Sequence, residues 1–133
     1  MTQKTRHISI SINASFDSVY LYVSEPKNLP QWAAGLAQST VSKSGDDWLA
    51  ESPMGLVKIR FVPKNNMGVV DHDVTLPNGV IIHNPLRVLR NHDGAEVVFT
   101  LIQQIGMSDE NFEADAAMVE KDLRTLKEML ESK

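Results

Sequence analysis

Short strand-like runs separated by turn signals fill the middle of this sequence and constrain its fold more than any other feature. Between residues 36 and 104 the turn-forming stretches SGDD, SPMG, KNNMG, LPNG and NHDG recur, and no helical pattern of apolar residues interrupts them. This organisation is typical of an antiparallel meander and does not suit alternating β-α-β units. Together with the strictly alternating run HISISI at residues 7–12, it predicts about seven strands. The runs of the meander are 36–43, 48–52, 56–62, 69–75, 80–90 and 95–104.

Two short helices are expected between the first strand and the meander. Asn13 or Ser15 can cap a helix over residues 16–24, because their side chains accept hydrogen bonds from free N–H groups of the first turn. A second short helix over residues 28–34 carries a proline in its first turn, where a missing N–H costs nothing.

A long helix is expected at the C-terminal end. After Gly106 the apolar residues step by three and four, which predicts an amphipathic helix of about six turns. Ser108 or Asp109 can cap it. Its apolar stripe consists of Phe112, Ala116, Val119, Leu123, Leu126 and Leu130.

A hairpin around residues 76–80 orients the central stretch VVDHDVT. Proline, asparagine and glycine in succession suit a type I turn followed by a left-handed glycine. This register places His72 opposite Asn84. It also places Asp73 opposite His83.

Asp71 and Asp73 flank His72, so strand alternation puts both carboxylates on the face opposite the imidazole. There they lie beside Lys58 and Arg60 of the preceding strand, whereas burying two carboxylates would be strongly unfavourable. We therefore expect both aspartates on an outer, charged face and His72 on the inner, apolar face.

We expect no metal and no cofactor. A metal site would have to use Asp71, His72, Asp73 and His83, but neighbouring strand residues point to opposite faces. Asp73 and His83 alone lack a third ligand. The sequence has no cysteine, which excludes disulfides, thiolate metal sites and thiol catalysis.

Composition favours one globular domain spanning residues 1–133. The net charge of −4 comes with no basic stripe, so nucleic acid is not an expected partner. The sequence shows no signal-peptide pattern and no apolar run of membrane-spanning length. We therefore expect a cytoplasmic protein, either a monomer or a weak homodimer, with no integral membrane association.

The order of these elements resembles the START and birch-pollen-allergen superfamily, whose architecture is the helix-grip fold. The opening ISISINASFDSVYLYVSEPKNLPQWA and the later PLRVLRNHDGAEVVFTL are similar to its bacterial polyketide cyclase/dehydrase and lipid-transport branch. The resemblance covers essentially the whole chain. It implies an α+β fold in which a seven-stranded curved antiparallel sheet wraps the long C-terminal helix. The superfamily includes transporters, hormone receptors and cyclases and has no universal catalytic motif.

The resemblance also implies a cavity between sheet and helix, and the small Ala116 and Ala117 of the helix leave room for one. From the residues alone, the same pattern equally suits a tightly packed core. If the cavity is open, His72 and Asn84 are expected to orient a ligand. The expected walls are Trp32, Phe61, Phe99, Phe112, Ala116, Val119 and Leu123.

Three functions therefore stay open. The first is binding of an apolar or amphipathic small molecule, with transport or sensing as its use. The second is a cyclase or dehydratase with His72 as general base; the helix stripe offers no second polar group for it. The third is a protein-interaction domain with a filled core, which an excess of exposed apolar residues would support.

Overall fold

The computed structural model describes residues 1–37 and 39–132. Gln38, which falls inside the predicted strand 36–43, and Lys133, the last residue of the predicted domain, lie outside the described residues. The strands are β1 (Thr5–Ile12), β2 (Val41–Ser44), β3 (Asp47–Ser52), β4 (Gly55–Phe61), β5 (His72–Thr75), β6 (Ile81–Asn84), β7 (Leu86–Asn91) and β8 (Gly94–Ile102). The helices are α1 (Phe16–Val23), α2 (Leu29–Trp32) and α3 (Asp109–Glu131), with 3-10 turns η1 (Pro26–Asn28) and η2 (Ala34–Leu36).

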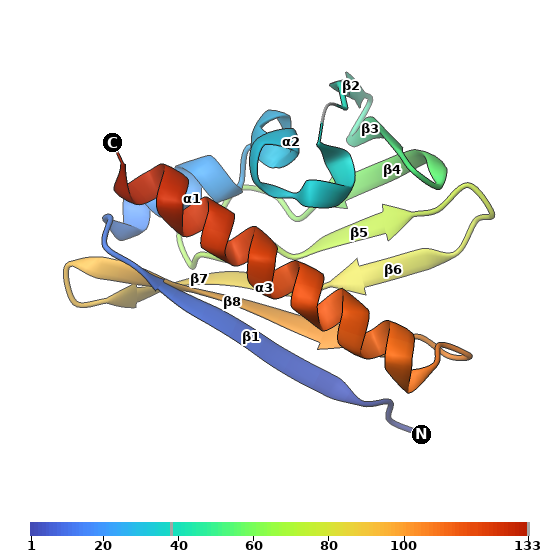
Figure 1. Cartoon of the computed structure of the whole chain (residues 1–133). Helices are drawn as coiled ribbons and strands as arrows, with labels where there is room; N and C mark the ends of the chain where they lie inside the picture. The colour runs from blue at the N-terminus through green and yellow to red at the C-terminus, as the bar shows by residue number, and fades with distance from the viewer. Residues whose placement is uncertain (38, 133) are drawn as a thin grey trace.

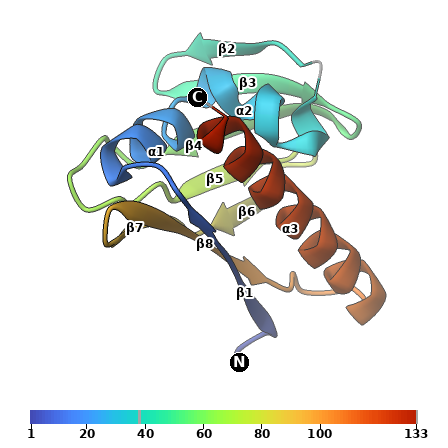
Figure 2. The same cartoon turned by 60° about the vertical axis from the view of Figure 1, so that its left-hand side comes forward.

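The strands form two antiparallel sheets, one in the order β1-β8-β7 and one in the order β2-β3-β4-β5-β6. Helix α3 runs diagonally across one side of both sheets (Figure 1). Helices α1 and α2 lie near the C-terminal end of α3 (Figure 2). The expected α+β class, with a long C-terminal helix packed on antiparallel strands, is confirmed.

The expectation of a single seven-stranded sheet is wrong. The predicted run 80–90 divides at Pro85 into β6 and β7, because proline has no N–H to donate to a ladder. Here the side chain of Asp71 replaces the backbone of the neighbouring strand as the hydrogen-bond acceptor. The Oδ1 atom of Asp71 accepts a hydrogen bond from Leu86 N at 2.9 Å.

The two sheets nevertheless remain joined beside this interruption. Val70 N donates to Leu86 O, and Val88 N donates to Gly68 O, each at 2.8 Å. These bonds keep the register of the β5–β6 hairpin, so the strands on either side of the interruption are not shifted relative to each other.

The predicted register of the β5–β6 hairpin is confirmed. His72 pairs with Asn84 and Asp73 pairs with His83. The turn closes with Gly79 N donating to Leu76 O at 2.9 Å, and Gly79 has the positive φ of 89° that the predicted turn requires.

The outer face carries the predicted charges, with one correction. Asp73 is half-buried, and its Oδ1 forms a hydrogen bond with Nδ1 of His83 at 2.5 Å. Asp71 is not exposed as a solvated carboxylate would be, because only 9% of the residue is accessible. Arg87 covers it, donating from Nε and Nη2 to its two carboxylate oxygens at 2.8 Å each. This hydrogen bonding holds the pKa of Asp71 below its ordinary value.

The predicted helix caps are confirmed at α1 and α3. The hydroxyl of Ser15 accepts from Ser18 N, and that of Ser108 accepts from Asn111 N, each at 3.1 Å. The second helix is shorter than expected, because its polypeptide continues on both sides as 3-10 turns.

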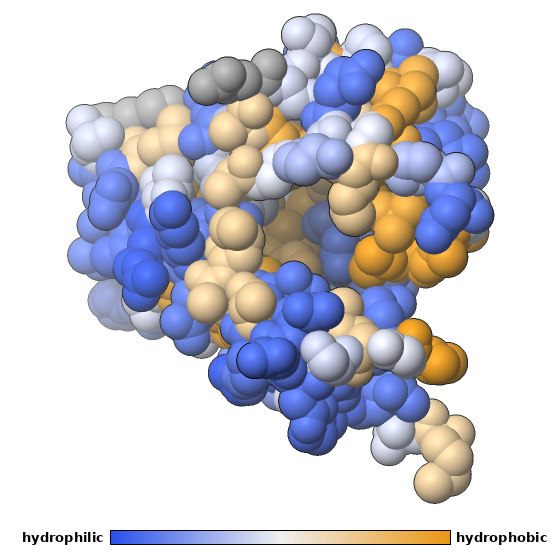
Figure 3. Space-filling view, turned by 45° about the vertical axis from the view of Figure 1, so that its right-hand side comes forward, coloured by the Kyte–Doolittle hydropathy of each residue, from blue (hydrophilic) through white to orange (hydrophobic). Residues whose placement is uncertain are grey.

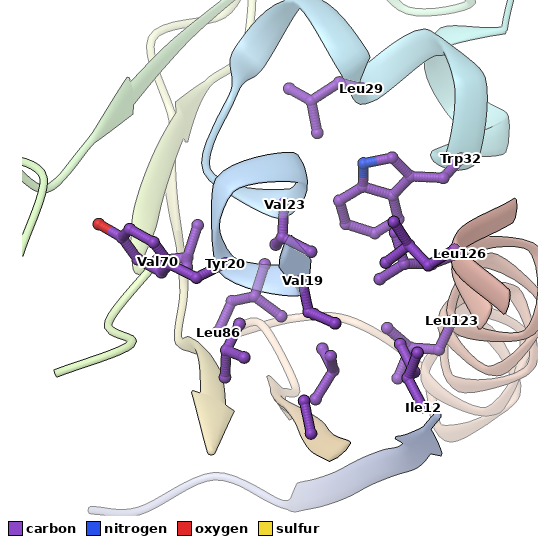
Figure 4. Packing of buried hydrophobic residues seen from close by; sticks show 14 of the residues in the cluster. Ile12, Val19, Tyr20, Val23, Leu29, Trp32, Val70, Leu86, Leu123 and Leu126 are labelled. Carbon is purple, nitrogen blue, oxygen red and sulfur yellow. The ribbon is translucent and has the colours of Figure 1, made fainter. Parts of the chain in front are cut away.

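The core lies between α1, α2, α3 and the inner faces of the sheets. Figure 4 shows side chains from all three helices converging on one interior space. The α3 stripe is buried except at Val119, which is half-buried. Each fully buried Leu, Val or Ile stabilises the fold by about 1.5–3 kcal/mol. Among residues 1–37 and 39–132, no helix has the length and apolar character required to cross a membrane.

Candidate ligand-binding site

The surface is hollowed on the side where the β5–β6 hairpin and the N-terminal half of α3 come forward, and the floor of the hollow is largely apolar (Figure 3). Inner-face residues near this opening are half-buried, whereas those deeper in the fold are buried. The half-buried set is Val74, Leu76, Ile82, Asn84, Phe99, Leu101 and Val119.

The gradient is clearest on β8. Val97 is fully buried, but Phe99 and Leu101, the next residues on the same face, are half-buried. Side chains two residues apart on a strand share one face, so this face becomes more accessible to solvent from Val97 toward Leu101.

The predicted wall residues differ in burial. Phe99 and Val119 belong, with the predicted ligand-orienting Asn84, to the half-buried set around the hollow. Phe61 is half-buried at the opposite end of β4. The remaining four are buried, at 2% to 7% exposure: Trp32, Phe112, Ala116 and Leu123.

His72 occupies the inner face of β5 as a buried, neutral imidazole. Its ring stacks on Phe61 with centroids 4.7 Å apart. Its Nδ1 lies 3.0 Å from Val70 O, a carbonyl that can only accept, so Nδ1 carries the proton. Burial lowers the pKa of His72, which outweighs the attraction of the neighbouring Asp71 and Asp73 carboxylates.

This tautomer leaves Nε2 as a hydrogen-bond acceptor. Within the described residues Nε2 has no hydrogen-bond partner, and the side-chain amide of the paired Asn84 has none either. The inner face thus presents one acceptor from His72 beside an amide that both donates and accepts.

Two acidic residues of α3 lie near Val119 and were not singled out from the sequence; Asp115 is exposed and Asp122 is half-buried. Asp115 and Asp122 lie two turns apart and flank Val119 on the helix. The Oδ1 atom of Asp122 accepts from Ala34 N at 3.1 Å, which ties α3 to η2. Burial raises the pKa of both carboxyls. Their spacing from Val119 places both residues beside the apolar stripe of α3, and this spacing could have located them from the sequence.

A separate cavity of about 310 Å³ lies at the other end of β4. Tyr20, Trp48 and Phe61 are among its walls, and Lys43 and Lys64 supply charge at its edge. Phe61, expected as a wall of the main hollow, lies instead between His72 and this second cavity.

Trp32 is 7% exposed, and its indole Nε1 is buried without a hydrogen-bond partner among the described residues. Its ring packs in the interior with side chains from α1 and α3, including Val23 and Leu126 (Figure 4). This packing makes Trp32 part of the apolar core. Among residues 1–37 and 39–132, no group of three His, Asp or Glu side chains could hold a metal ion.

Comparison with solved structures places this architecture among known folds. An uncharacterized protein from Bacillus thuringiensis superimposes with a TM-score of 0.74 at 15% identity, over 96% of this chain and 98% of that chain. A START superfamily protein from Mycobacterium smegmatis gives 0.71 at 10% identity, over 96% and 97%. The fold is START-like.

This START-like domain is also similar to the Aha1 dimer from Colwellia psychrerythraea, with a TM-score of 0.71 at 16% identity over 96% of both chains. Identities this low establish the fold and leave the activity to be argued from the site. No family model matches the chain, and no curated protein matches it.

Proposed function

We propose that this START-like domain binds an apolar or amphipathic small molecule in the hollow between the sheet and α3. The observation that supports it most is the graded exposure of inner-face residues such as Val97, Phe99 and Leu101, which leaves apolar surface facing the opening. Covering that surface with a ligand would stabilise the complex by roughly 25 cal/mol for each Å² buried.

Polar groups in the site specify part of the ligand. The Nε2 atom of neutral His72 accepts a hydrogen bond, so it suits a hydroxyl or N–H group of the ligand. Asn84 can hold a neighbouring carbonyl or hydroxyl. A small apolar body with one or two neutral polar groups therefore fits better than a strongly charged molecule.

The first test is native mass spectrometry of the purified protein, followed by denaturing extraction and a thermal-shift screen with fatty acids, sterols and aromatic polyketides. Val119→Phe narrows the hollow, and we expect it to weaken binding of any hit by about tenfold or more. Ala114→Phe is the matched control, because Ala114 is exposed on the same helix and should leave affinity unchanged. Equal effects of both variants, or no hit in either assay, would contradict the proposal.

One acidic residue of α3 favours a second candidate, a cyclase or dehydratase acting in the same hollow. Acid–base chemistry needs two groups, and the half-buried Asp122, whose pKa is raised by burial, is the candidate acid, with His72 as the candidate base. His72→Leu separates the two functions. A binder should lose affinity by a few kcal/mol at most, whereas an enzyme should lose turnover by ~10²-fold or more.

Exposed apolar side chains at the β3–β4 and β5–β6 ends bear on a third candidate, a protein-interaction domain. They are Met54, Leu56, Val80 and Ile81, between 47% and 65% exposed. Substituting Met54 and Ile81 with serine should leave binding in the hollow intact. A loss of association with other proteins but not of small-molecule binding would favour this third function.

A further inference from the structure

Strand β1 forms an edge of its sheet, and alternate residues direct their backbone groups away from that sheet. Gln103 N donates to Lys4 O at 2.9 Å in the β1–β8 register, which identifies Lys4 as a residue that bonds to β8. In an antiparallel pair, every second residue forms its backbone hydrogen bonds with the neighbouring strand. The N–H and C=O groups that point away from β8 therefore belong to residues 5, 7, 9 and 11.

Helix α3 closes this free edge at one end. Lys127 Nζ donates to Ser11 O, and Asn13 N donates to Glu131 Oε2, each at 2.7 Å. Within residues 1–37 and 39–132, no comparable partner is present for the outward backbone groups of Thr5, His7 and Ser9. Three consecutive outward residues thus remain able to pair with another strand.

A groove runs along this free stretch. It has a volume of about 530 Å³ and lies between residues 6–10 of β1 and the side chains of Glu120, Leu123 and Arg124 on α3. We call it the β1–α3 groove. Glu120 and Arg124 are one turn apart, yet neither forms an ion pair within the described part of the chain. Arg6, by contrast, is already paired with Glu113.

We propose that the β1–α3 groove binds an extended peptide segment of another protein, which adds to the sheet as a strand beside β1. An extended backbone is the ligand that satisfies outward N–H and C=O groups at alternate residues. Its side chains on the inner face would contact α3. Charge complementarity favours an acidic side chain near Arg124 and away from Glu120.

A second copy of the chain matches this groove less well than an acidic peptide does. The inner-face side chains that its β1 would bring are Arg6, Ile8 and Ile10, so it would place a basic side chain and no acidic one near Arg124.

Amide hydrogen exchange tests the free edge on the intact protein. We expect the N–H groups of Thr5, His7 and Ser9 to exchange rapidly and those of Arg6 and Ile8, which bond to β8, to exchange slowly. Slow exchange at His7 and Ser9 in the monomer would overturn the proposal. Concentration-dependent protection with a dimer mass would overturn it in favour of self-association.

Binding is then measured by titrating a ¹⁵N-labelled sample with capped heptapeptides that alternate threonine and valine, with a central glutamate or a central lysine. We expect the glutamate peptide to protect His7 and Ser9 and to bind more tightly than the lysine peptide. Ser9→Pro removes an outward N–H without removing a bond to β8, and should weaken binding by about fivefold to tenfold. Ser9→Ala, which keeps the N–H, is its control.

Two variants test whether the groove recognises the charge of the peptide. Arg124→Glu should reverse the preference between the two peptides, whereas Lys121→Glu, an exposed site outside the groove, should not. Absence of protection by either peptide at millimolar concentration would overturn the proposal. Equal binding by wild type and Ser9→Pro would place the peptide elsewhere and also overturn it.

Discussion

Asp71→Asn should destabilise the protein more than any other single isosteric change on the outer face of the sheets. The Asp71 carboxylate accepts from Leu86 N at 2.9 Å and from two nitrogens of Arg87 at 2.8 Å each. An asparagine can accept at one oxygen only, and its NH₂ group would face the Arg87 donors. The variant therefore loses a charge-assisted hydrogen bond and leaves buried polar groups in conflict.

The expected cost is about 2–3 kcal/mol. One lost charge-assisted bond contributes roughly 1.5–3 kcal/mol. Breaking a fully buried ion pair costs about 3–5 kcal/mol, but the Arg87 side chain is 48% exposed and remains partly solvated, which lowers that figure. Urea denaturation at pH 7 measures the loss, with an unchanged m-value showing that the unfolded state is unaffected.

Asp73→Asn is the matched control, since Asp73 lies on the same face and pairs with His83, but both side chains are about half exposed, at 46% and 60%. Its cost should stay below about 1 kcal/mol. The pKa of Asp71 is lowered in the fold, so its stabilising effect is present above the ordinary aspartate pKa and is lost as pH falls through the folded value. A cost below about 0.5 kcal/mol for Asp71→Asn, or equal costs for both variants, would refute this reasoning.

Three further changes have defined outcomes. Burial lowers the pKa of His72, so wild type should lose stability as pH falls below the ordinary histidine pKa, and His72→Phe should flatten that part of a stability–pH curve. Burial raises the pKa of Asp122, which destabilises the fold when the carboxyl is charged; Asp122→Asn should be more stable near neutral pH, and thermal melts should show this difference shrinking as pH falls. Gly68→Ala should prevent folding or cost more than about 3 kcal/mol in urea denaturation, because its Cβ would lie 2.0 Å from Val88 O at a φ of 76°.

Local patterns predicted much of this fold. The proline–asparagine–glycine turn sets the β5–β6 register, and the pairing of His72 with Asn84 follows from counting outward from that turn. Serine caps at Ser15 and Ser108 mark the starts of α1 and α3 because their hydrogen bonds involve residues only three positions away. Such features depend on neighbours in sequence, which a single sequence contains.

The division into two sheets depends on a contact that a strand pattern does not encode. Pro85 is visible in the sequence, but the break in the ladder also depends on a tertiary contact. The Asp71 carboxylate accepts the hydrogen bond from Leu86 N, fifteen residues away in the chain. The burial of Asp71 follows from the same contact, because Arg87 and Leu86 together compensate its charge. Strand alternation predicts which face of the sheet a side chain lies on. It does not predict which neighbouring side chains will cover it.

The candidate site was partly predictable for the same reason. Alternation along β5 and β8 predicted the inner orientation of His72 and Phe99. It gave no indication of Asp122, because the contact of its carboxylate with Ala34 N of η2 has no counterpart in helical periodicity.

The interruption at Pro85 also has a mechanical consequence. Ion pairs and hydrogen bonds along β1 attach α3 to the three-stranded sheet, whereas Val74 and Ile82 on the other side of the hollow belong to the five-stranded sheet. Strands bend most readily where the ladder is interrupted. Bending at the Asp71–Leu86 contact would change the width of the hollow and would strain the two backbone hydrogen bonds, Val70 N to Leu86 O and Val88 N to Gly68 O, that join the sheets beside Pro85.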